Sequence, residues 1–330
     1  MALFTFLSSL FKSNSEPQEV YRSVEFSDHV VTIHSLGFTG RYAKSPNGRW
    51  AIAWDDGDIP ADGAIYKGIQ AKGLGRFVVL RDGRFRGVGH AERPNACAIA
   101  NNGSFVLQDL RSEEQIQSVF KVYDKDCVKL VEFHQSAHIY SSAISDNGVI
   151  AVCHTANARN SDGNMLTAFD LNSGAKLFSI TPETGRASSY VFDEANRRVG
   201  AVLKDVGTFY YSADGVLEDP DGFLNAKLNS ANPLKALSEI EEVSQFYEIS
   251  EDQLEYVLRL SGSLLEDSNI NDTPNTKARL LKARGKLLQA SGRDQEALSH
   301  YNEALEIDPA IGVKRVATAI QKKLAKPNID

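Results

Sequence analysis

Cysteine is scarce in this chain, and the way the cysteines are placed excludes several kinds of protein. The 330 residues contain three cysteines, Cys97, Cys127 and Cys153. Their number is odd and none of them forms a C-x-x-C pair, which argues against a disulfide framework and against a zinc or redox site. Each falls in or beside a segment with strand-like alternation, so we interpret them as small apolar residues of the core.

Long apolar runs and excess positive charge are also missing. No apolar run is long enough to cross a bilayer, and no secretory signal is evident, so we expect a cytoplasmic protein. Lys and Arg number 36 against 43 Asp and Glu, a net charge of −7. Proteins that bind nucleic acid usually cluster an excess of cations, so we expect no nucleic-acid partner.

The sequence lacks the common motifs of catalysis and cofactor binding. No glycine-rich loop has P-loop spacing, residues 73–75 do not complete a dinucleotide-binding pattern, and no serine or cysteine stands in a nucleophile elbow. The acidic residues 55–58 lack the further spaced carboxylates of a known calcium loop, so a solvated turn is the preferred interpretation. His134 and His138 are four residues apart in a strand-like segment, a spacing that does not converge on one metal. We therefore expect no cofactor and no metal.

Residues 139–180 contain the clearest structural pattern. Two alternating segments meet at Asn147-Gly148, a dipeptide typical of two-residue hairpin turns. A second pair of alternating segments flanks residues 171–174, whose Asn and Gly suit a tight turn. Strand, turn, strand, loop, strand, turn, strand is the plan of one propeller blade.

The same unit recurs in looser form on both sides. Copies of the first hairpin occupy residues 42–54, 97–107 and 190–203, and copies of the second occupy residues 77–85, 120–131 and 208–217. The turn glycines Gly48, Gly103 and Gly148 are 55 and 45 residues apart. Periods of this size are typical of arrays in which each repeat buries its faces against its neighbours.

These repeats resemble those of WD40 and quinoprotein-type β-propellers, most nearly at residues 167–178. The resemblance is one of pattern, because no Gly-His and Trp-Asp pair brackets a blade. It implies an all-β propeller-like domain of about four blades over residues 19–222. Residues 30–34 form a lone strand before the first repeat, whereas Pro220 disfavours a strand after the last. We expect the N-terminal strand to complete the last blade and close the array, with an open array as the alternative.

Helical periodicity replaces the strand pattern near Asn232, and residues 223–330 form the second predicted domain. Predicted helices cover residues 233–246, 251–265, 276–289, 293–306 and 313–324. Ser250 is the expected N-cap of the second helix, and the composition of residues 267–275 predicts a loop.

Residues 281–309 resemble a tetratricopeptide repeat (TPR). Gly285, Ala297, Tyr301, Ala304 and Pro309 occupy the small, small, aromatic, small and proline positions of that motif. Small residues allow two helices to approach closely, and a proline cannot continue the second helix. The resemblance implies an all-α, TPR-like solenoid with a degenerate preceding repeat.

The resemblance also implies a binding face. In this family the first helix of a repeat lines a groove that grips extended peptides, at positions occupied here by Arg279, Lys282, Lys286, Gln289 and Ala290. Such a cationic stripe favours an acidic segment or a C-terminal carboxylate. Two alternatives are a solvated basic face and a face covered by the acidic helix that contains Glu239, Glu241 and Glu242.

Two repeat domains without a catalytic motif predict a non-enzymatic scaffold or adaptor for protein partners. The alternative function is a metal-dependent hydrolase whose site lies at the propeller axis and uses Asp55, Asp56, His90 or His154. Residues 1–18 form an amphipathic segment and linker. We expect the amphipathic segment either to pack on the chain's own domains or to dock on a partner or a membrane surface.

Overall fold

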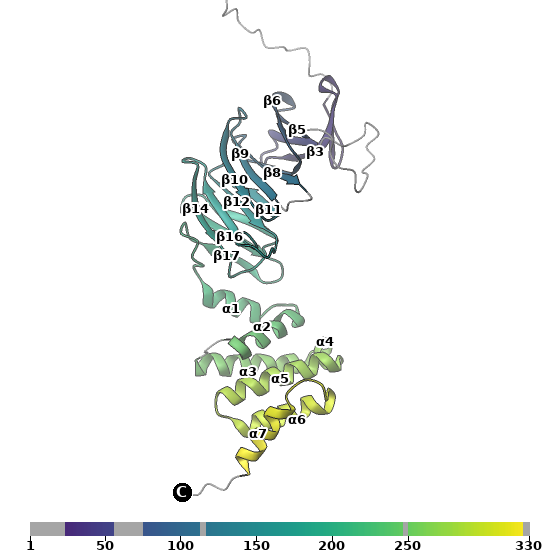
Figure 1. Cartoon of the computed structure of the whole chain (residues 1–330), viewed down its shortest axis with the longest axis vertical. Coiled ribbons are helices and arrows are strands. Elements are labelled where there is room, and N and C mark those ends of the chain that lie inside the picture. The colour runs from purple at the N-terminus through teal and green to yellow at the C-terminus, as the bar shows by residue number, and fades with distance from the viewer. Residues whose placement is uncertain (1–23, 56–74, 113–116, 247–249, 326–330) are drawn as a thin grey trace, which may run out of the picture. The chain divides into compact units, whose positions relative to one another are not determined.

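The computed structural model describes residues 24–55, 75–112, 117–246 and 250–325, and Figure 1 shows the course of the chain. The chain divides into two compact units. The β-rich unit ends at Leu217, and the mainly helical unit begins at Glu218 and also takes in residues 202–209. The predicted amphipathic segment, Asp56 and Asp58 lie outside the described residues. No helix in the described part is long and apolar enough to span a membrane.

The β-rich part contains four sheets of antiparallel strands that follow one another along the sequence. The first sheet has the order β1-β2-β3-β4-β5-β6, the second β10-β9-β8-β7, the third β11-β12-β13-β14 and the fourth β15-β16-β17. The strands are β1 (Val24–Phe26), β2 (Val30–Ile33), β3 (Phe38–Lys44), β4 (Trp50–Asp55), β5 (Gly75–Arg81), β6 (Arg84–Ala91), β7 (Pro94–Ile99), β8 (Phe105–Ser112), β9 (Gln117–Tyr123), β10 (Lys129–Gln135), β11 (Ile139–Ile144), β12 (Ile150–Thr155), β13 (Leu166–Asp170), β14 (Ala175–Ile180), β15 (Ser189–Asp193), β16 (Arg198–Leu203) and β17 (Gly207–Tyr211).

The hairpins predicted from the sequence are confirmed, except that the last one is reduced. The turns between β3 and β4, β7 and β8, and β11 and β12 each contain a glycine with positive φ: Gly48 at 71°, Gly103 at 90° and Gly148 at 72°. A side chain with a Cβ is strained in this conformation, which explains the recurring Asn-Gly pairs. In the fourth sheet the segment after β17 contributes one bridge, between Tyr211 and Leu217.

Apolar side chains hold successive sheets face to face. Phe77 of the first sheet packs against Phe105 and Tyr123 of the second, with ring centroids 5.4 and 5.3 Å apart. Phe120 of the second sheet stacks on Phe169 of the third at 5.7 Å. All five rings are at most 9% exposed. The core of this unit is therefore a series of layers, each shared by two neighbouring sheets.

Hydrogen bonds between turns also link neighbouring sheets. The backbone N–H of Asn47 donates to Asn101 Oδ1 (2.8 Å), and the N–H of Asn101 donates to the Asp146 carbonyl (2.7 Å). Further along, the N–H and side-chain amide of Asn147 both donate to the Glu194 carboxylate at 2.8 Å. The first-hairpin turns thus form a connected row from the first sheet to the fourth.

The predicted closure of the array by the N-terminal strand is wrong. Strand β2 pairs antiparallel with β3, with Ile33 opposite Phe38, and β1 extends the same sheet by pairing with β2. The connection between β2 and β3 is a single turn ending at Gly37, which has φ 53°. A pairing across so short a loop costs much less chain entropy than one with the distant last sheet. Among the described residues, no strand of the first sheet is hydrogen-bonded to the fourth.

This pairing predicts where the N-terminal strands contribute stability. Deleting residues 1–36 should accelerate amide hydrogen exchange in β3 and leave exchange in β15 and β16 unchanged, because only β3 loses its neighbour. Val31→Ala is a milder test, since this β2 side chain is fully buried. It should cost about 1–3 kcal/mol of unfolding free energy, with the faster exchange again confined to the first sheet. Faster exchange in the fourth sheet after either change would contradict the observed pairing.

The helical part contains seven helices in its described residues. They are α1 (Pro220–Leu228), α2 (Pro233–Phe246), α3 (Glu251–Glu266), α4 (Ser268–Asn271), α5 (Pro274–Ala290), α6 (Asp294–Ile307) and α7 (Lys314–Leu324). The five predicted helices are confirmed, and Ser250 and Gln253 form a complete capping box at the start of α3. Two helices were not predicted. Helix α1 begins with Pro220 after the N-cap Asp219, and α4 lies inside the predicted loop with Asp267 as its N-cap.

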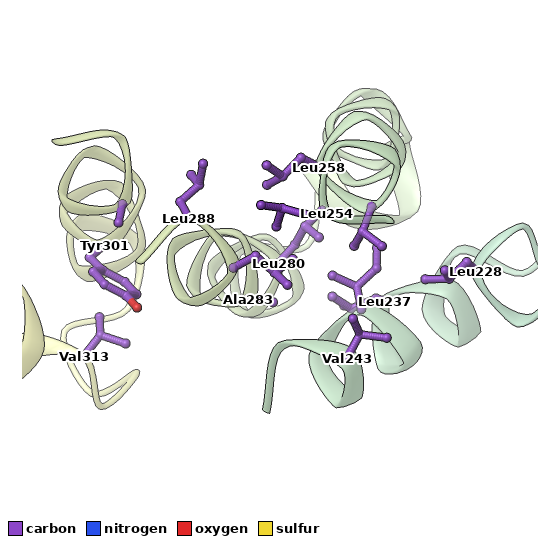
Figure 2. Packing of buried hydrophobic residues seen from close by; sticks show 14 of the residues in the cluster. Leu228, Leu237, Val243, Leu254, Leu258, Leu280, Ala283, Leu288, Tyr301 and Val313 are labelled. Carbon is purple, nitrogen blue, oxygen red and sulfur yellow. The ribbon is translucent and has the colours of Figure 1, made fainter. Parts of the chain in front are cut away.

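One continuous apolar core joins these helices. Figure 2 shows Leu254 and Leu258 of α3 pointing towards Leu280 of α5, and Leu280 is fully buried. At the other end of the core, Tyr301 of α6 lies against α5, where a Cβ on Gly285 would be 2.5 Å from the ring. Ala297 and Ala304 flank Tyr301 on α6 and are fully buried. The small and aromatic positions noted in the sequence thus meet in one tight helix contact.

Candidate partner-binding face of the helical unit

The four predicted site residues lie along α5, and the structure gives them different surroundings. Arg279, Lys282 and Lys286 are partly buried, whereas Gln289 is exposed. Their spacing of three, four and three residues places them on one side of the helix. The stripe therefore exists, and what distinguishes its members is the partner that each side chain has within the unit.

Arg279 is neutralised by the acidic helix α2. Its Nε donates to Glu241 Oε1 (2.9 Å) and its Nη2 donates to Glu241 Oε2 (2.5 Å), a bidentate pair. The hydrogen bond to Glu241 raises the pKa of Arg279. This part of the stripe matches the alternative in which α2 covers the basic face. The other two acidic residues considered, Glu239 and Glu242, instead contact Lys227 of α1.

Lys282 has a structural partner. Its Nζ donates to the backbone carbonyl of Ile311 at 2.9 Å, in the connection between α6 and α7. Three donors on an ammonium leave capacity for a further acceptor, but removing this lysine would also leave the Ile311 carbonyl without its donor. A substitution at Lys282 therefore changes both charge and local structure.

Lys286 has no hydrogen bond or ion pair among the described residues. Burial lowers its pKa, the neighbouring Lys282 lowers it further, and Glu241 acts in the opposite direction. A partly desolvated ammonium beside a like charge is destabilising unless an anion approaches it. Lys286 is thus the uncompensated cation of the stripe.

Gln289 ends the stripe and supports the helix pair. Its Oε1 accepts a hydrogen bond from the Tyr301 hydroxyl at 2.9 Å. The amide oxygen is therefore used within the unit, and its NH2 group is the part of this side chain that could serve a ligand. Sequence reasoning offered the helix of Glu241 as one alternative partner of the stripe, but it missed the Ile311 carbonyl and Tyr301, because these belong to a connection and a helix that the spacing on α5 does not reveal.

The ion pair between α2 and α5 can be measured by a double-mutant cycle. Glu241→Gln and Arg279→Gln should each lower the unfolding free energy of the helical unit by about 0.2–1 kcal/mol, because both side chains remain partly exposed. The double variant should lose less than the sum of the two, since the same pair is broken in each. Strictly additive losses in urea unfolding followed by circular dichroism would show that the pair contributes nothing.

Three of the residues considered for a hydrolytic site lie in the described part of the chain, and they are not gathered at one place. Asp55 and His90 lie on either side of Arg76 in the first sheet, and His154 belongs to the third. Asp55 is 5% exposed and accepts hydrogen bonds from the backbone N–H (3.0 Å) and Nε (3.1 Å) of Arg76. Within the described residues there is no group of three or more His, Cys, Asp or Glu side chains that could hold a metal ion.

His154 instead joins the third sheet to the fourth. It is fully buried, its Nδ1 lies 2.8 Å from the Tyr190 hydroxyl, and its Nε2 lies 3.3 Å from Asn164 Oδ1. An amide oxygen can only accept, so Nε2 carries the proton and Nδ1 accepts from Tyr190. Burial lowers the pKa of His154, and the Arg186 guanidinium lowers it further, against the opposing hydrogen bond to Asn164. The imidazole is accordingly neutral at pH 7.

This depressed pKa makes stability depend on pH. An unfolded histidine titrates near pH 6.5, so as the pH falls through about 6.5 the unfolded chain binds a proton that folded His154 does not accept. Its contribution is fully present above that pH and is lost below it, by up to about 1.4 kcal/mol per pH unit. The unfolding free energy of the β-rich unit can be measured from Trp50 and Trp54 fluorescence. Between pH 7.5 and 5.5 it should decrease less in His154→Gln than in the exposed control His90→Gln. Equal pH dependence in the two variants would contradict this role.

Comparison with known proteins adds no assignment. No protein-family model matches the chain, and no curated protein is detectably similar to it.

Proposed function

We propose that this chain is a non-enzymatic interaction protein, a scaffold or adaptor with propeller-type repeats followed by a TPR-like helical array. In this proposal the α5 stripe binds an acidic segment or a C-terminal carboxylate of a protein partner. Lys286 is the observation that carries it. An ammonium that is partly buried, next to Lys282 and without an anionic partner in the described residues, is stabilised when a ligand supplies a carboxylate.

The packing around α5 supports the TPR-like part of the proposal. Gly285 lets α6 approach closely enough for Tyr301 to lie against the α5 backbone, and the Tyr301 hydroxyl fixes Gln289. Rigid packing of this kind keeps the exposed side of α5 in one conformation, which lowers the entropic cost of binding a peptide. The hydrolase alternative has no comparable support, because Asp55 is engaged by Arg76 and His154 lies in another sheet.

Lys286→Glu tests the proposed binding face. The probe is a fluorescein-labelled octapeptide with two glutamates and a free C-terminus, and affinity is measured by fluorescence anisotropy on the full chain. We expect Lys286→Glu to weaken binding about tenfold or more, since a charge-assisted hydrogen bond is replaced by repulsion. Binding to the native protein should also weaken with added salt.

Lys314→Glu is the matched control, because Lys314 is exposed at the start of α7 and the substitution changes net charge equally. It should leave affinity unchanged. The same octapeptide with glutamines and an amidated end should not bind. Equal effects of the two lysine variants, or equal affinity for the charged and neutral peptides, would refute the proposal, provided circular dichroism shows both variants folded.

A further inference from the structure

The start of strand β11 carries a bulge that turns one aromatic side chain outward. Ile139 pairs with Thr155 and Ser141 pairs with His154, so Tyr140 is the extra residue between them. Ile139 is 4% exposed, and its backbone is held in place because its N–H donates a hydrogen bond to Ser118 Oγ at 3.0 Å. The Tyr140 side chain is nevertheless 54% exposed. A bulge of this kind fixes the backbone while directing a side chain away from the sheet.

Arg186 lies over this exposed ring on an equally fixed loop. Its guanidinium carbon is 4.3 Å from the Tyr140 ring centroid. On one side of Arg186, the Thr184 N–H donates to the Tyr211 hydroxyl (3.0 Å), which itself donates to Thr184 Oγ1 (2.9 Å). On the other side, Ala187 is 4% exposed. Both members of the stacked pair therefore project from anchored backbone.

The stacked guanidinium has donors to spare. Arg186 forms no ion pair with any described residue, although it lowers the pKa of the buried His154 nearby. Stacking uses the face of the guanidinium and leaves the N–H groups at its edge available. Stacking on the ring also limits the rotamers of Arg186 before any ligand arrives.

One buried polar atom near Tyr140 also lacks a partner. His138 Nδ1 is inaccessible to solvent and has no hydrogen-bond partner among the described residues. His138 stands two residues before Tyr140 in the chain. Unsatisfied buried polar atoms are rare in folded proteins and often mark a place that a bound molecule or water completes.

We propose that Tyr140 and Arg186 form a carboxylate-binding site on the β-rich unit, separate from the α5 stripe. One pre-oriented guanidinium presents a planar fork that matches a planar carboxylate through two parallel hydrogen bonds. Many phosphate sites use an α-helix N-terminus, and the described residues of the β-rich unit form no α-helix that could supply one. The carboxylate is supplied either by a small organic acid or by the C-terminus of a peptide.

Titration monitored at Arg186 distinguishes these sources. The ¹⁵N–¹H signal of Arg186 Nε, assigned by its loss in Arg186→Lys, is followed while acetyl-trialanine, its C-terminal amide, propionate or inorganic phosphate is added to the full chain. We expect a saturable shift with acetyl-trialanine and none with the amide. Tighter binding of the peptide acid than of propionate identifies a peptide C-terminus as the ligand, and equal binding identifies a small acid.

Variants then test the two residues by calorimetry with the tighter-binding acid. Arg186→Gln should weaken binding about tenfold or more, whereas the exposed control Arg84→Gln should not. Tyr140→Ala should weaken binding severalfold through lost orientation, and Tyr140→Phe should retain native affinity because the ring remains. Lys286→Glu should leave the Arg186 titration unchanged, so failure of the α5 proposal is a separate result.

Three results would overturn the assignment of a carboxylate site. They are binding of the amide as tight as that of the acid, binding of phosphate as tight as that of the carboxylates, and equal affinities of the Arg186→Gln and Arg84→Gln variants.

Discussion

Burial of one sheet against the next is the interaction on which the β-rich unit depends. A single sheet cannot cover its own apolar faces. Phe77 is therefore buried against Phe105 and Tyr123 of the second sheet, and Phe120 against Phe169 of the third. Removing one sheet would expose the ring layers on both sides of it. The same nearest-neighbour constraint explains the turn row, in which Asn47, Asn101 and Asn147 each bond to the following sheet. These hydrogen bonds are directional, so they fix how neighbouring sheets are positioned along each other, whereas apolar contacts are non-directional.

The constraint also shows why the first sheet differs from the others. A first repeat has a neighbour on one face only, and here the second apolar face carries Val31, Ile33 and Phe38, contributed by β2 and the start of β3. The added hairpin enlarges the first sheet instead of completing the last one. The fourth sheet ends in a bridge because Pro220 begins α1 directly afterwards, and a proline at the first helical position favours that helix.

Local signals predicted most of the elements, and distant pairings limited the rest. Asn-Gly turns and alternating strands identify hairpins because both strands lie within a few residues of the turn, and the Ser250 capping box marks a helix start in the same way. Strand β2 could have paired with the edge of the nearby first sheet or with the edge of the distant last sheet. Hydrophobic periodicity identifies a strand but does not show which of the two edges it joins. Helices α1 and α4 were missed because each is short and its composition suits a turn. The spacing of the residues along α5 correctly predicted that they share one face of the helix. It could not identify their partners Glu241 and Ile311, which belong to other segments of the chain.

Contacts between distant segments also explain why two cations on α5 differ. Arg279 and Lys286 lie on the same face of the helix, two turns apart. Glu241 of α2, however, forms a bidentate pair only with Arg279. Glu241 attracts Lys286 electrostatically but forms no hydrogen bond with it. The loss of hydration on partial burial of the Lys286 ammonium is therefore not offset by an ion pair. Arg186 differs from both, because the ring of Tyr140 orients it without neutralising it. A cation that is oriented or desolvated but unpaired retains the capacity to bind an anion, and tertiary packing rather than residue type decides which cations these are.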